Sequence, residues 1–240
     1  MATATIIGLI LIVILIVLVI KFVKNIMKSI IIIISILVIL SLLGSSFVYL
    51  DINDFKEKFP VLPSLYLLEK DDKIVAGIFG AKIYSYIPEE QLNSYQQNFE
   101  ENKLEEIKSN HYKLFIININ AFDSVTDIQI EQDGSLSKEE VDDLLDSSTP
   151  IEDFMAINNI PEQDKEILMN DFKIDDEAEF KALLFYRLFD EATEDGTFFV
   201  LKEYKKDNVI VYPKSTIFRL VKELPLSLLN KLIGNLNAGE

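Results

Sequence analysis

Oxygen-bearing side chains are concentrated around the Asp-Gly pair at residues 133–134. Glu131, Asp133, Ser135 and Glu140 supply three carboxylates and one hydroxyl within a short stretch. Calcium prefers oxygen ligands and takes about six to eight of them from carboxylates, carbonyls and water. These four residues are therefore our candidate ligands for a calcium ion.

The stretch Gln129–Glu140 resembles the EF-hand calcium loop when it is aligned on Gly134. The resemblance implies that Glu140 stands at the last loop position, which supplies a bidentate carboxylate. Gln129 replaces the usual first Asp, and a strand-like run precedes the loop where the motif has a helix. A strand, an Asp-Gly turn and a helix capped by Ser137 explain the same residues. We favour this second interpretation and expect no calcium binding tighter than millimolar.

The chain contains one histidine, His111, and no cysteine. The absence of cysteine excludes disulfides, thiol catalysis and thiolate metal sites. A Ser-His-Asp triad would need a recognisable nucleophile, and no G-x-S-x-G sequence is present. We therefore assign no catalytic and no cofactor-binding residue.

Acidic clusters recur along the chain at residues 142–146, 175–177 and 191–195. Two converging carboxylates can hydrolyse a glycosidic bond. Because the chain has 39 acidic residues, such clusters are expected by chance, and most of these lie where a helix is expected to begin or end. A carboxylate-dependent hydrolase is therefore the alternative, and a protein without enzymatic activity is the interpretation we favour.

Strand patterns are frequent in the segment that carries these residues, 65–240. Two β-rich runs flank Asp71-Asp72, which predicts a hairpin, and the nearly continuous apolar run at 112–118 is typical of an interior strand. A second hairpin is expected from residues 197–204 and 208–212.

Helical patterns are grouped between the strands rather than alternating with them. Ser137 and Glu140 match a capping box for a helix over 138–146. The grouping predicts one acidic α+β soluble domain at 65–240, with a small mixed sheet and several helices. Further helices are expected from residue 88, over 151–158, 162–172, 175–192 and 216–223, and from 225 to 234.

Two uncharged apolar runs occupy residues 3–20 and 30–50, and a connector at 21–29 carries three lysines. A helix needs about 20 apolar residues to cross the hydrocarbon core of a bilayer. We therefore predict a transmembrane helical hairpin at 1–50, followed by a juxtamembrane linker at 51–64. A single span with an interfacial segment and a buried core helix are the alternatives.

Lysines near membrane spans favour the cytoplasmic side of the bilayer. Lys21, Lys24 and Lys28 lie in the connector, whereas Lys56 and Lys58 follow the second apolar run. By this margin of three lysines to two, we place both termini and the acidic domain outside the cell.

The segment after the apolar runs is strongly acidic. Residues 51–240 contain all 39 acidic residues and 20 of the 23 basic residues, which is a formal charge of −19. Such a surface repels phosphate groups, which excludes nucleic acid as a partner.

A membrane anchor without a catalytic or cofactor motif predicts a non-enzymatic protein. Its partners are then the lipid bilayer and either another protein or further copies of the same chain. The alternatives are a membrane-anchored carboxylate-dependent hydrolase and an oligomer whose hairpins line a pore. Against the pore, neither apolar run carries a polar stripe.

Overall fold

The computed structural model describes residues 34–35, 50–51, 53–55, 57–59, 61–81, 83–130, 134–193 and 198–225. The predicted spans at 3–20 and 30–50 lie outside the described residues, except for residues 34, 35 and 50, which are helical. Among the residues that the structure describes, no helix is long and apolar enough to cross a membrane. The chain divides into two compact units, Met1–Asp51 and Ile52–Glu240.

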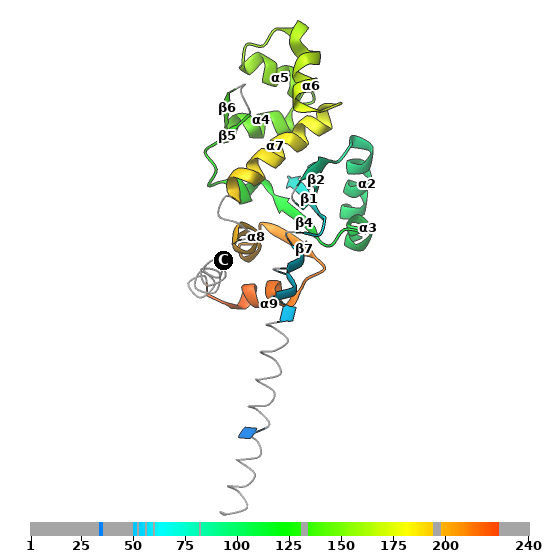
Figure 1. The fold of residues 1–240 in the computed structure, drawn as a ribbon, viewed down its shortest axis with the longest axis vertical. Coiled ribbons are helices and arrows are strands. Elements are labelled where there is room, and N and C mark those ends of the chain that lie inside the picture. The colour runs from blue at the N-terminus through cyan, green and yellow to red at the C-terminus, as the bar shows by residue number, and fades with distance from the viewer. Residues whose placement is uncertain are drawn as a thin grey trace, which may run out of the picture. The chain divides into compact units, whose positions relative to one another are not determined.

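The second unit is built around a five-stranded mixed sheet, as the sequence predicts (Figure 1). Its strand order is β3-β2-β1-β4-β7. Strand β4 runs parallel to β1, and the other neighbouring pairs are antiparallel. The strands are β1 (Ser64–Lys70), β2 (Lys73–Gly80), β3 (Tyr84–Tyr86), β4 (Leu114–Asn118) and β7 (Val209–Tyr212).

The hairpin predicted at Asp71-Asp72 is confirmed, because β1 and β2 are antiparallel partners on either side of it. Asp71 and Asp72 have φ angles of 51° and 62°. Positive φ at both central residues is the geometry of a type I′ turn, whose twist matches the twist of the two strands. Asp tolerates this backbone region better than most residues do.

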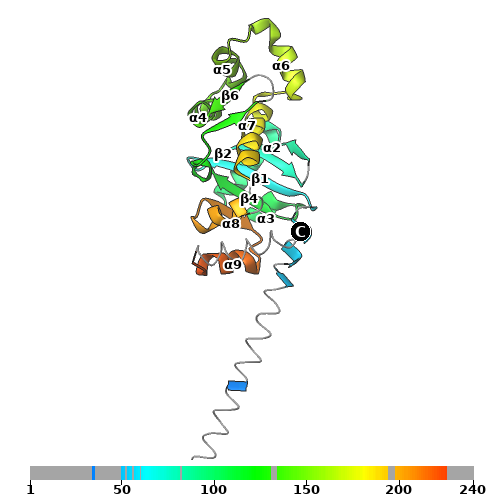
Figure 2. The ribbon, with the colours of Figure 1, turned by 60° about the vertical axis from the view of Figure 1, so that its left-hand side comes forward.

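Strands β1 and β4 are buried on both faces of the sheet. Residues Leu65–Leu68 and Leu114–Ile117 are all at most 2% exposed. Helices α2 (Glu89–Glu100) and α3 (Leu104–Lys108) pack on one face, and α7 (Glu177–Ala192) packs on the other (Figures 1 and 2). The prediction that residues 112–118 include an interior strand is therefore confirmed.

The helices predicted over 138–146, 151–158, 162–172, 175–192 and 216–223 are found at closely matching ranges, whereas the helix predicted from 225 to 234 lies outside the described residues except for residue 225. Helix α4 begins directly after Ser137, where the capping box predicted it. A two-stranded sheet of β5 (Asp127–Gln129) and β6 (Ser135–Ser137) precedes this helix. The other elements are η1 (Ile119–Phe122), α4 (Lys138–Asp146), α5 (Pro150–Ile157), η2 (Glu162–Asp164), α6 (Lys165–Phe172), α8 (Phe198–Lys205) and α9 (Thr216–Glu223).

The prediction of a second hairpin from 197–204 and 208–212 is wrong. Helix α8 occupies most of the first segment, and β7 pairs with β4 instead. Four apolar side chains of α8 are buried in the main core, so packing against the core outweighs the strand propensity of the apolar run. These side chains are Phe199, Val200, Leu201 and Tyr204.

Part of the segment expected to be a linker packs into the second unit. The described residues 53–55 and 57–58 are helical, and Phe55 is only 4% exposed. The Phe55 ring stacks on Phe59 at 4.8 Å and meets Phe218 of α9 edge to face at 5.5 Å. The side chains of this stretch therefore contribute to the core.

We expect Phe55→Ala to lower the free energy of unfolding of residues 52–240 by about 3 kcal/mol or more, because a buried ring is replaced by a cavity. Chemical denaturation measures the loss. Lys58→Ala is the matched control, since the Lys58 amine pairs with Asp54 at the surface, and such pairs contribute at most about 1 kcal/mol. Equal effects of the two substitutions would show that this stretch does not stabilise the domain.

Candidate functional site

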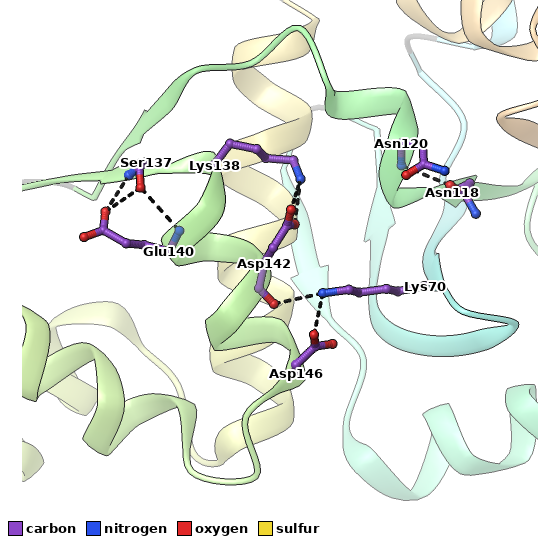
Figure 3. Close-up of polar contacts among 8 residues, drawn as sticks. All are labelled: Lys70, Asn118, Asn120, Ser137, Lys138, Glu140, Asp142 and Asp146. Carbon is purple, nitrogen blue, oxygen red and sulfur yellow. Dashed lines mark hydrogen bonds and ion pairs between the residues drawn. The ribbon is translucent and has the colours of Figure 1, made fainter.

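Two of the four candidate calcium ligands, Glu131 and Asp133, lie outside the described residues. Ser135 is exposed in β6, and the Glu140 carboxylate accepts hydrogen bonds of 2.8 Å from the backbone N–H and the hydroxyl of Ser137 (Figure 3). The bond from the backbone N–H, more than the one from the hydroxyl, holds the pKa of Glu140 below its usual value. Glu140 therefore caps α4, as the favoured interpretation expects.

Two acidic residues of α4, Asp142 and Asp146, are paired with lysines. Lys70 Nζ donates to Asp146 Oδ2 at 2.7 Å and to the Asp142 carbonyl oxygen at 3.0 Å (Figure 3). Lys138 Nζ lies 2.6 Å from both carboxylate oxygens of Asp142. These contacts tie the turn after β1 to α4. In the part of the chain that the structure describes, no three acidic or histidine side chains converge on a metal position.

His111 is held by local contacts after α3. Its Nδ1 lies 3.0 Å from the Lys108 carbonyl oxygen, and its half-buried ring meets Phe79 edge to face at 5.7 Å. These contacts indicate that His111 holds the loop between α3 and β4 in place.

A carboxyl pair that the sequence does not reveal lies where α5, α6 and α7 begin. Glu177 Oε2 accepts a hydrogen bond of 3.0 Å from the Ile151 N–H, and Lys165 Nζ lies 3.9 Å from Glu177 Oε1 and hydrogen-bonds to Glu152. Burial raises the pKa of Glu177, and repulsion by the Glu152 carboxylate adds to this. The hydrogen bond from Lys165 lowers the pKa of Glu152.

Glu177 also lines a cavity of about 430 Å³ beside β2 and α2. Lys181 and Glu89 face the same cavity. Burial lowers the pKa of Lys181, while the nearby carboxylates of Asp146 and Glu177 oppose that effect. This cavity is the place among the described residues where carboxylate chemistry has the most support.

A larger cavity, of about 810 Å³, lies beside the edge strand β3. It is lined by residues 83–86, by the turn from α6 to α7 and by one side of α7, and we call it the β3 groove. The Tyr84 ring lies 5.8 Å from Tyr66 and 5.5 Å from Tyr186. Burial raises the pKa of Tyr84 above its usual value.

The hydrogen-bond pattern of the sheet fixes which way the backbone of β3 points. The Ile87 N–H donates to the Gly77 carbonyl at 3.0 Å, which makes this a hydrogen-bonded pair. Because such pairs alternate in an antiparallel ladder, Phe79 and Ser85 form the next one. The backbone N–H and C=O of Tyr84 therefore point away from β2, toward the outer edge.

Gly80 allows the chain to fold back from β2 into β3. Its φ angle is 155°, a conformation that residues with a side chain rarely adopt. A Cβ atom at this position would lie 2.1 Å from the backbone oxygen of Ile83. Gly80, the last residue of β2, therefore allows β3 to fold back beside β2 as the edge strand.

No family model, no curated protein and no solved structure matches this chain. Its function is therefore inferred from its own residues.

We expect Ser137→Ala to lower the free energy of unfolding by about 1 kcal/mol, because the cap of α4 is lost. Calcium at sub-millimolar concentration should leave the stability of both proteins unchanged. Denaturation with and without calcium, together with calorimetry, measures this. Glu139→Gln is the control, since Glu139 is exposed in the same helical turn. Stabilisation by micromolar calcium that Glu140→Gln removes would contradict the capping interpretation and favour the calcium loop.

We expect Glu177→Gln to stabilise the domain at pH 7. A raised pKa means that the folded state holds the proton of Glu177 more tightly than the unfolded chain does, so ionisation at higher pH opposes folding. The Gln oxygen still accepts from the Ile151 N–H, and its amide can donate to Glu152. The stability difference should be full above the raised pKa and disappear as the pH falls to the ordinary glutamate value of about 4.3.

Denaturation midpoints between pH 4 and pH 8 measure this difference. Glu166→Gln removes an exposed acid from the first turn of α6 and serves as the control. A Glu177→Gln variant that is less stable than wild type at pH 7 would show that the attraction to Lys165 outweighs burial.

Proposed function

We propose that this chain is a membrane-anchored, non-enzymatic protein that presents its acidic α+β domain outside the cell and binds a protein partner there. The observation that carries the proposal is the β3 groove. The groove contains two features side by side. One is the outer edge of β3, to which no other described strand is hydrogen-bonded, and the other is a group of tyrosine side chains. Tyrosine is enriched at protein interfaces, and sheet edges bind extended chains.

The anchor is supported by the two apolar runs at 3–20 and 30–50. Each is long enough to span a bilayer core as a helix. The lysines of the connector favour its cytoplasmic location, which places the acidic domain on the opposite side.

Several acidic side chains already form ion pairs or hydrogen bonds within the domain. They are therefore less available to act on a substrate, which favours binding over catalysis. Asp142 and Asp146 pair with lysines, and Glu177 accepts a backbone hydrogen bond. The cavity that Glu89 and Glu177 line is the observation that favours the alternative, a carboxylate-dependent hydrolase.

One labelling experiment tests both the location and the partner. Single cysteines replace Ser85, Ser135 or Ser29 in the full chain, which has no other cysteine. Intact cells are treated with a membrane-impermeant maleimide that carries a photoreactive group, and are then irradiated. We expect labelling at Ser85 and Ser135 but not at Ser29, and a discrete cross-linked product from Ser85 alone, because Ser85 lines the groove and Ser135 does not.

Labelling at Ser29 only would place the domain in the cytoplasm and contradict the predicted topology. Labelling at Ser85 without a cross-linked product would contradict partner binding at the groove. A specific turnover by the full chain that Glu177→Gln abolishes would support the hydrolase instead.

A further inference from the structure

We infer, on the basis of the proposed function, that the β3 groove binds an extended, lysine- or arginine-rich segment of a partner protein, which adds to the sheet as a strand beside β3. The inference names the chemistry of the partner and its mode of binding. It depends on three features of the groove: the edge, the tyrosine surface and the acidic wall.

The edge is suited to strand addition. Tyr84 directs its backbone N–H and C=O outward, where an added strand can pair with them. Exposed sheet edges are commonly protected by charged residues, proline or a bulge. β3 has the sequence Tyr-Ser-Tyr without a charge, and Ile83 just before it is 86% exposed. The uncharged edge is three residues long, and Lys82 before it and Pro88 after it limit an added strand to about this length.

The tyrosine surface provides contacts for one face of such a strand. Alternate side chains of an added strand point to the same side of the sheet. On the side of α7 they would meet Tyr84 and Tyr186, whose rings are in mutual contact at 5.5 Å. Leu183 and Phe172 lie beneath this surface and are buried, so the two tyrosine rings supply the aromatic contacts. Such rigid aromatic surfaces bind a partner with little loss of side-chain entropy.

The acidic wall selects for a basic segment. Asp171, Asp175 and Glu179 line the groove, and the first two are exposed. The Asp175 N–H donates to Glu179 Oε2 at 2.7 Å, which fixes this carboxylate at the start of α7. Lys173 and Arg187 lie on the same lining, so the acids are in excess by one.

The charge of the whole domain argues against a second copy as the occupant. Residues 51–240 carry a formal charge of −19, so two domains repel each other, whereas a basic segment is attracted. Neutral tyrosine rings next to the carboxylates also favour cations, because a cation is attracted to the face of an aromatic ring.

The test uses the full chain in detergent micelles and three fluorescent peptides. The first alternates Lys and Val. The second alternates Glu and Val. The third has the charge of the first but is N-methylated on alternate residues, which removes the backbone donors that a strand needs. We expect only the first to bind, and we expect it to slow amide hydrogen exchange at Tyr84.

Two charge variants provide the matched comparison. The double variant Asp171→Lys with Asp175→Lys should weaken binding of the Lys–Val peptide by about tenfold, since each lost rim charge has a modest effect. The control Glu90→Lys with Glu106→Lys changes the net charge equally. It alters exposed residues of α2 and α3, on the other face of the sheet. This control should weaken binding by less than about twofold.

Equal binding of the N-methylated peptide, or equal weakening by the control, would show attraction by net charge alone and overturn strand addition. A wild-type dimer that the Lys–Val peptide dissociates would make a second copy the occupant and overturn the basic partner. If Ser85 gives a cross-linked product in cells but no peptide binds, then the proposed function stands and strand addition by a basic segment is wrong.

Discussion

The parallel contact between β1 and β4 is the constraint on which the rest of the domain depends. Two parallel strands cannot be joined by a tight turn, so the chain must leave the sheet and return. Here the chain first continues through β2 and β3 of the same sheet, and then crosses one face as α2 and α3 before it enters β4. The apolar side chains of residues 65–68 and 114–117 point to both faces of the sheet and are buried on both. Helices α2 and α3 cover one face, so the other face must be covered as well. Helix α7 supplies that cover, and β3 is left at one edge of the sheet.

Three lysines of the domain connect elements within this framework. Lys70 joins the turn after β1 to α4, and Lys165 lies between the acids of α5 and α7. Lys205 Nζ donates to two carbonyl oxygens near the end of α9, at 3.0 Å each. A lysine used in this way stabilises an element end or a buried carboxylate. The surplus of acidic residues then lies at the surface, where it favours basic partners and disfavours association of like domains.

Much of the fold could be predicted because local chemistry and tertiary packing agree. The Asp71-Asp72 turn, the capping box at Ser137 and the interior strand β4 each have a short-range pattern with a single physical interpretation. Helix α8 was missed because an apolar Phe-Phe-Val run suits a strand or a buried helix equally, and only its packing partners distinguish them. The carboxyl pair of Glu152 and Glu177 joins helices that are distant in sequence, and no local spacing predicts it.

The β3 groove could not be predicted for the same reason. Its tyrosines and acids come from residues 83–86, 171–175 and 179–187, and only the path of the chain around β1 and β4 brings them together. Spacing in the sequence instead drew attention to the acids near Gly134, where Glu140 has a capping role. A carboxylate whose charge a lysine already compensates has little left to offer a substrate, whereas the exposed carboxylates of Asp171 and Asp175 beside the sheet edge still have their charge to offer. That difference in engagement, rather than the number of acidic residues, favours binding of a partner over hydrolysis.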